Sequence, residues 1–221
     1  MAILTRAFLA RSAERVARDL LGCVLVRKVD GVRMAGRIVE TEAYLGVKDG
    51  GSHSFGGRRT PRVEAMYMQA GTAYVYFTYG MHYCMNVVCG EVDEPVAVLI
   101  RALEPTQGLD AMRARRGKGA KRDRDLCSGP AKLCQAMEIG PALNTHDLLL
   151  GQAMWLESGE PVANKLVARA ARIGLGTESV WKTKPLRFVL KDNEHVSVPV
   201  PGGKHQPGRG IRGELRREAA N

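Results

Sequence analysis

Apolar and polar residues alternate along several stretches of the chain, and this alternation predicts β-strands. The first predicted strand, 23–29, is followed by the turn dipeptide Asp30-Gly31 and by a return strand that runs from Val32 to Tyr44. Two strands joined by so short a turn pair antiparallel, which argues against a doubly wound parallel sheet. Further strands are predicted at 73–78, 82–88, 96–103, 153–156, 166–175 and 186–190.

Apolar residues recur with a helical period in fewer places. Residues 12–21 place their apolar side chains on one side, and Gly22 follows as a natural end of the helix. Short helices are also predicted at 106–116 and from Pro130 onward, where proline suits a first helical turn. The stretch 113–125 between them is dense in charge and is predicted to be a mobile linker.

No internal repeat and no clear linker divides the chain. We therefore expect one domain over residues 1–205. Residues 206–221 are polar and rich in arginine, and we expect them to form a disordered basic tail.

The charge of the chain narrows its possible partners. Lysine and arginine number 33 against 23 aspartates and glutamates, a formal net charge of +10 over 221 residues. Such an excess favours a polyanionic partner, most often nucleic acid, although a protein can be basic without binding one.

The cellular setting is predicted from what the sequence lacks. No apolar run approaches the ~18 residues of a membrane span, and the first residues lack the apolar stretch of a signal peptide. The five cysteines do not have the spacing of zinc knuckles. We therefore expect free thiols in a cytoplasmic protein without a membrane partner.

The return strand carries the sharpest chemical signal. In an extended chain Glu40, Glu42 and Tyr44 point to one face, with alternate residues roughly 7 Å apart. Buried carboxylates need partners, and Arg101 inside the apolar run 96–103 is available to Glu42. Two alternatives remain: Arg101 snorkels to solvent at a strand end, or the strand is half-exposed and carries its glutamates outward.

Two stretches have the features of phosphate contacts. A glycine-rich loop over 45–60 holds His53 and leads into Arg58-Arg59-Thr60-Pro61-Arg62. Glycine lets the backbone come close to a ligand, and clustered arginines suit phosphate, although an isolated loop histidine can simply be solvated. The predicted helix start near Pro130, with Lys132 beside it, is a second candidate.

The residues Tyr79-Gly80-Met81 join two predicted strands, where turn tips are usually polar. A large apolar pair at such a tip is either buried by the rest of the fold or inserted as a wedge between base pairs.

The sequence excludes several kinds of chemistry. It contains no phosphate loop, no dinucleotide fingerprint, no His/Cys cluster with metal spacing and no nucleophile elbow. What remains is a strand carboxylate, a loop histidine, several tyrosines and a basic surface. These groups suit hydrolysis at a sugar carbon beside a base: the carboxylate activates water, aromatic rings sandwich the base and an apolar finger fills the gap.

Several of these runs, in the same order, resemble the alkyladenine DNA glycosylase family, also called 3-methyladenine or N-methylpurine DNA glycosylases. The resemblance extends over about residues 20–190, and its matching runs are 36–44, 53, 58–62, 74–81, 84–86, 99–105, 127–130 and 132. It implies an α+β single-domain fold: a curved antiparallel, partly open barrel-like sheet, surrounding helices and a protruding hairpin that enters the minor groove.

The resemblance also implies a monofunctional DNA repair glycosylase. Such an enzyme flips an alkylated or deaminated purine out of double-stranded DNA, hydrolyses its N-glycosidic bond with water and leaves an abasic site. No cofactor, no metal and no Schiff-base lysine are implied, and the expected partner of the monomer is duplex DNA that contains damaged purines.

By position, the resemblance implies roles for individual residues. Glu42 would be the general base, Glu40 a structural acid, and Arg101 and the backbone of Ile173 would help to hold the attacking water. The base pocket would comprise Tyr44, His53, Tyr76 and Asn86, of which Asn86 would disfavour the exocyclic amine of guanine. The implied DNA contacts are Tyr79 as the wedge, Met66 and Met81 beside it, and Arg58, Thr60, Arg62 and Lys132.

Two other classes of function stay open at this point. A non-catalytic nucleic-acid binder would have no need of a buried carboxylate, so the motifs of Glu42 and Arg101 count against it. An enzyme that acts on free nucleosides would need neither the Tyr79 tip nor the net charge of +10.

Overall fold

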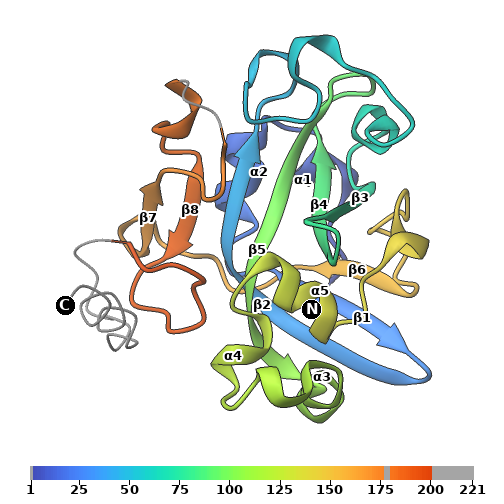
Figure 1. Ribbon diagram of the computed structural model, residues 1–221, viewed down its shortest axis with the longest axis vertical. Helices are drawn as coiled ribbons and strands as arrows, with labels where there is room; N and C mark the ends of the chain where they lie inside the picture. The colour runs from blue at the N-terminus through green and yellow to red at the C-terminus, as the bar shows by residue number, and fades with distance from the viewer. Residues whose placement is uncertain (1, 177–179, 201–221) are drawn as a thin grey trace, which may run out of the picture.

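The long strand β2 (Val32–Tyr44) lies in the middle of an eight-stranded antiparallel sheet in this computed structural model, which describes residues 2–176 and 180–200 (Figure 1). One edge of β2 pairs with β5 (Val96–Gln107) along most of its length. Its other edge pairs first with β1 (Val24–Val29) and, near the end, with β8 (Arg187–Leu190). The tail predicted at 206–221 lies outside the described residues.

The remaining strands extend the sheet to both sides. Its main path runs β3 (Ala73–Thr78), β4 (His82–Cys89), β5, β2, β1, β6 (Met154–Glu157), and β7 (Val167–Ala170) adds to β8. The register of β2 on β5 slips at three points, including Ala35/Gly36 and Ile38/Glu40. Such bulges bend a strand, so β2 can change partners along one edge and the sheet curls. The expected curved antiparallel α+β fold is confirmed.

Short helices surround the sheet. They are α1 (Arg6–Leu9), α2 (Ala13–Asp19), α3 (Leu109–Arg116), α4 (Arg124–Cys127) and α5 (Pro130–Ala136). Single 3₁₀ turns lie at Gly46–Lys48, Phe55–Gly57, Glu64–Tyr67, Gly117–Gly119, Pro141–Leu143, Asn164–Leu166 and Val180–Lys182. Within the described residues, no helix has the length and apolarity needed to cross a membrane.

Three sequence-based predictions need correction. The helix expected at 106–116 begins only at Leu109, because β5 continues to Gln107 opposite Ala35. The stretch 113–125 is not an irregular linker: it folds into the end of α3, a 3₁₀ turn and the start of α4. The strand expected at 166–175 ends at Ala170.

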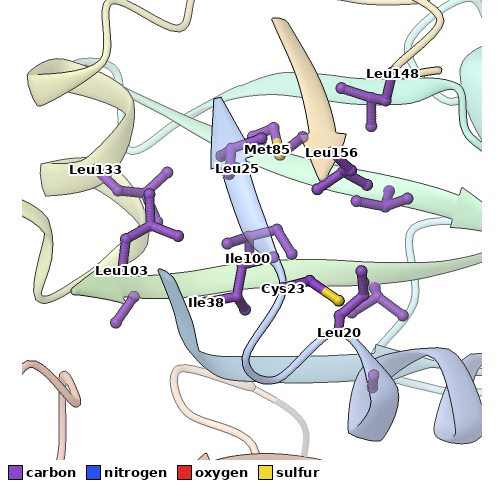
Figure 2. Packing of buried hydrophobic residues seen from close by; sticks show 14 of the residues in the cluster. Leu20, Cys23, Leu25, Ile38, Met85, Ile100, Leu103, Leu133, Leu148 and Leu156 are labelled. Carbon is purple, nitrogen blue, oxygen red and sulfur yellow. The ribbon is translucent and has the colours of Figure 1, made fainter. Parts of the chain in front are cut away.

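The core lies on one face of the sheet. Figure 2 shows apolar side chains of the sheet, such as Ile38 and Ile100, packed together with Leu20 and Leu133. Leu20 follows α2, which contacts β2 and β5, and Leu133 belongs to α5, which contacts β4 and β5. The five cysteines are free, as expected, and all of them are buried.

The opposite face of the same strands carries polar and aromatic groups. In β5, Ile100 belongs to the core cluster, whereas Leu99 and Arg101 line a pocket. In β3, Val75 belongs to the core, whereas Tyr74 and Tyr76 line the same pocket. Period-2 alternation therefore gives the sheet one apolar face and one functional face.

Candidate active site

A cavity of about 470 Å³ opens on the functional face of the sheet. This volume is typical of pockets that bind small molecules. Side chains of β2 to β5 form its walls, and the segments 50–53 and 173–176 close it from two loops.

Glu42 lies directly behind the wall of this cavity and is fully buried. Its Oε1 accepts a hydrogen bond from the backbone N–H of Ile173 at 2.7 Å and lies 3.3 Å from Arg101 Nη1. Its Oε2 accepts a hydrogen bond from the Tyr44 hydroxyl at 2.9 Å. Three groups that line the cavity thus converge on one carboxylate, and the half-exposed strand considered above is wrong.

The environment of Glu42 acts on its pKa in opposite directions. Burial raises the pKa, and this is the largest influence. Arg101, the Ile173 N–H and the Tyr44 hydroxyl each favour the ionised form, but the balance leaves the pKa above its ordinary value of 4.5. Glu42 is thus a desolvated carboxylate and a stronger base than a solvated one.

Arg101 bridges the two buried glutamates of β2. Its Nε donates to Glu40 Oε1 at 3.1 Å, its Nη1 lies beside Glu42, and its side chain is only 8% exposed. The expected pair with Glu42 is therefore confirmed, and the snorkelling alternative is wrong.

Glu40 has a full set of donors that sequence reasoning missed. Arg187 Nη1 donates to its Oε1 at 2.8 Å, and the Ser197 N–H donates to its Oε2 at 2.6 Å. The Ser197 hydroxyl also donates to Oε1 at 2.9 Å. Two arginines and two glutamates thus form one buried, closely balanced charge cluster, as buried charges require.

Aromatic rings form another wall of the cavity. His53 Nδ1 lies 2.8 Å from the Tyr74 hydroxyl, and the His53 ring meets the Tyr76 ring edge-on at 4.6 Å between centroids. Burial lowers the pKa of His53, and Arg62 and Arg58 lower it further, so the ring is neutral at neutral pH. The solvated-loop alternative for His53 is therefore wrong.

The amide of Asn86 completes this wall. Its Nδ2 donates to the Tyr74 backbone carbonyl at 3.0 Å, and the residue is buried at the pocket surface. The structure thus brings Tyr44, His53, Tyr76 and Asn86 around one cavity. Tyr74 and Cys84 also line it, and their alternation with core residues in β3 and β4 was the available signal.

The tip of the β3–β4 hairpin projects into solvent. Tyr79 is 80% exposed and Met81 is 69% exposed, so the buried alternative for this tip is wrong. Tyr79 has a φ of 51°, a left-handed conformation that disfavours a residue with a Cβ. The fold therefore holds an aromatic ring at the mouth of the cavity, where Tyr79 also contributes to the lining. Met66 lines the same cavity, buried in the pocket wall and packed with Tyr74.

Basic side chains flank the cavity. Arg58 is exposed and lines its rim, and Arg62 Nη2 donates to the Phe77 carbonyl at 3.0 Å. Thr60 is exposed in the same loop. Lys132 is exposed on α5, whose first residue, Pro130, also lines the cavity. Over 2–176 and 180–200, no cluster of three or more His, Cys, Asp or Glu side chains could hold a metal ion.

Comparison with known proteins gives a consistent result. The model of the Methylpurine-DNA glycosylase family matches residues 7–194. The chain is 47% identical over 201 residues to "DNA-3-methyladenine glycosylase" of Homo sapiens, a match that covers 86% of this chain and 66% of the relative. It is 48% identical over 195 residues to "Putative 3-methyladenine DNA glycosylase" of Carboxydothermus hydrogenoformans, a match that covers 88% of this chain and 98% of the relative. The chain spans about two thirds of the length of the human relative and 60% of that of the mouse relative.

Proposed function

Because the chain belongs to the methylpurine-DNA glycosylase family, we propose that it removes alkylated purines from double-stranded DNA by hydrolysis, leaving an abasic site. The observation that supports this function best is the buried Glu42, held by Arg101, Tyr44 and the Ile173 N–H at the wall of a base-sized cavity. The protein acts as a monomer without a metal or cofactor, and its substrates include deaminated purines.

Glu42 is the general base in this proposal. A carboxylate has about four acceptor sites, of which three are used here, so one remains for a water molecule. That water attacks C1′ of the sugar as the bond from C1′ to the purine nitrogen breaks. Its proton goes to Glu42, and the bonding electrons leave with the base. A purine alkylated at N3 or N7 already carries positive charge, so it departs without protonation.

The aromatic wall holds the flipped base. Tyr44, His53 and Tyr76 sandwich the purine, as aromatic side chains do in enzymes that extrude a base. A neutral His53 suits this role, because a cationic purine would be repelled by an imidazolium. Asn86 meets the edge of the base and disfavours the exocyclic amine of guanine.

The exposed tip and the basic rim hold the duplex. Tyr79, with Met81 beside it, enters the space that the flipped base leaves, as apolar wedges do in the minor groove. Met66 supports the pocket from behind. Arg58, Thr60, Arg62 and Lys132 contact phosphates, which position the protein on the duplex without reading its sequence.

The function is tested by measuring free base released from duplex oligonucleotides with EDTA present. Each duplex carries one lesion: a methylated purine, an etheno purine or hypoxanthine. We expect release of the methylated base and an alkali-labile abasic site in the strand. Tight binding without release from any lesion would favour a non-catalytic binder, and equal turnover of the free nucleoside would favour a nucleoside enzyme.

The wedge predicts a loss of affinity when its ring is removed. Tyr79→Ala should weaken binding to a lesion duplex by roughly tenfold to a hundredfold, since stacking on an aromatic ring contributes about 1–3 kcal/mol. The rate at saturating enzyme should fall less. Fluorescence anisotropy with a labelled duplex measures this, and Leu150→Ala, which alters another exposed apolar side chain, is the control. Unchanged affinity of Tyr79→Ala would remove the wedge from the mechanism.

The pKa of Glu42 predicts the acid side of the pH profile. A general base must be ionised, and burial raises the pKa of this carboxyl above 4.5. The single-turnover rate should therefore fall as pH decreases through a midpoint above 4.5, with a slope of one proton. A rate that is constant down to pH 4.5 would contradict the assignment of Glu42 as the base.

A further inference from the structure

A fully buried ion pair joins the glycine-rich loop to the segment that carries Ile173. Arg172 donates from Nη1 to Asp49 Oδ2 at 2.6 Å and from Nη2 to Oδ1 at 2.7 Å. Both side chains are 0% exposed. Burying two charges has a large desolvation cost, which only a well-matched bidentate geometry offsets. Neither partner is part of the proposed chemistry, so the pair needs another explanation.

Both partners are anchored to the backbone near the pocket. Asp49 accepts N–H hydrogen bonds from Leu45 at 3.0 Å and from Gly51 at 2.9 Å. Arg172 Nη1 also donates to the Ala43 carbonyl at 3.0 Å, and its guanidinium carbon lies 4.6 Å from the centre of the Tyr44 ring. One ion pair therefore connects the end of β2, an aromatic residue of the pocket and the loop that leads to His53.

The pair also fixes the backbone donor of Glu42. Strand β7 ends at Ala170, and among the described residues no strand pairs with the segment 171–176. Two arginine side chains anchor it instead: Arg187 Nε donates to the Ala171 carbonyl at 3.0 Å, and Arg172 pairs with Asp49. The residue after Arg172, Ile173, donates its N–H to Glu42 at 2.7 Å. A shift of Arg172 would move this donor away from the carboxylate.

Gly51 leaves the space that the guanidinium occupies. A Cβ at this position would lie 2.7 Å from Arg172 Nη2, closer than side chains approach, and 3.0 Å from Leu175 Cδ2, which is a tight contact. The glycine of this loop is thus matched to the position of Arg172.

We propose that Asp49 and Arg172 are positioning residues for base release, which together hold the Ile173 N–H against Glu42 and the Tyr44 ring against the base. This inference rests on the proposed function. The pair acts through Ile173 and Tyr44, because neither Asp49 nor Arg172 lines the cavity.

Asp49→Asn tests the role of the pair, because it keeps the size of the side chain and removes its charge. We expect the single-turnover rate at saturating enzyme to fall about tenfold or more, since a hydrogen bond to a charged group is loosened. The acid midpoint of the rate should move to higher pH, because the Ile173 N–H favours ionised Glu42. Affinity for the lesion duplex should change by less than about threefold.

The titratable and charged side chains around Glu42 are all kept in this variant. The titratable and charged residues that face it or its charge cluster are Tyr44 and Glu40 of β2, Tyr76 of β3, Cys84 of β4, Arg101 of β5 and Arg187 of β8. Arg172 contacts both Ile173 and the Tyr44 ring, so a moved midpoint would report the positions of the two donors through which the pair acts, the Ile173 N–H and the Tyr44 hydroxyl. The matched control is Asp147→Asn, which removes the charge that pairs with Arg6 outside the cavity and keeps an oxygen that can accept from the Leu149 N–H.

Gly51→Ala gives an independent test if the Asp49→Asn substitution impairs folding, because it displaces Arg172 and keeps both charges. As in Asp49→Asn, its rate should fall and its acid midpoint should move to higher pH. Gly140→Ala, where a Cβ meets nothing within 4 Å, should behave as the unmodified protein. Variants that fold less stably but keep the wild-type midpoint and rate per folded molecule would overturn the positioning role. A wild-type protein that releases no base would contradict the proposed function itself, which separates the two failures.

Discussion

Replacing Glu42 with glutamine should reduce base release by about 10²–10⁴-fold, the usual contribution of a positioned general base. The amide has the same shape, and its carbonyl oxygen can still accept from Ile173 and Arg101 at the place of Oε1. Its NH₂ group can donate to the Tyr44 oxygen at the place of Oε2. The pocket should therefore keep its form, while the group that accepts the proton of water is lost.

Single-turnover kinetics with excess enzyme measures the rate, and anisotropy on the same duplex measures binding. We expect Glu42→Gln to bind the lesion duplex as wild type does. Glu104→Gln is the control, since Glu104 contacts Arg37 and Asn193 rather than the cavity. Turnover within tenfold of wild type would exclude Glu42 as the base.

Replacing Arg101 with methionine should have the largest effect on stability, a loss of about 3–5 kcal/mol in the free energy of unfolding at neutral pH. Glu40 and Glu42 are both fully buried, and Arg101 lies between them. Without this cation the pKa of Glu42 rises further, because the Coulombic attraction to Arg101 lowers it in the native protein. Base release should fall as well, because more of Glu42 is protonated.

The pH dependence gives the sign of this effect. A buried carboxyl whose pKa is raised by folding destabilises the protein when it is ionised, so the deficit of Arg101→Met should grow as pH rises and shrink as pH falls. Urea unfolding at several pH values measures it. Arg169→Met breaks an exposed pair with Glu14 and should cost about 1 kcal/mol or less. If Arg101→Met lowered the free energy of unfolding by an equally small amount, Arg101 would not be stabilising the two buried glutamates, which would contradict this prediction.

Local rules predicted much of this site. Alternation placed Glu40, Glu42 and Tyr44 on one face of a strand, and in the structure Arg101 contacts both glutamates while Tyr44 donates to Glu42. The quoted runs predicted the family, which the match over residues 7–194 confirms. The alternation involves residues that are neighbours in the sequence, and the motifs follow one another in a fixed order. Both signals can therefore be recognised without knowing the fold.

Contacts between distant residues could not be read in this way. Asp49 and Arg172 are 123 residues apart, and the apolar residues around Arg172 made 166–175 resemble a strand. The chain leaves the sheet after Ala170, and Arg172 is buried against Asp49. An arginine within a run of small and apolar residues was the only hint of a buried partner.

The stretch 113–125 and the hairpin tip show the same limit. The charge density of the stretch 113–125 is typical of a linker. In the structure, however, Arg113 pairs with both Asp110 and Asp123 and so connects the two ends of the segment. At the tip, sequence could not decide between a buried and an exposed Tyr79, because its exposure depends on what the rest of the chain covers.

The central claim, that water aimed by Glu42 cleaves the N-glycosidic bond, is tested most directly by a single-turnover reaction with borohydride present. The duplex carries one 7-methylguanine, and mass spectrometry follows the strand, the free base and the protein. Attack by water gives free base and an intact strand with a reduced abasic sugar, which is the expected result. Attack by a protein amine would form an imine that borohydride traps as a protein–DNA adduct. An adduct equal in amount to the released base, or no release at all, would contradict the claim.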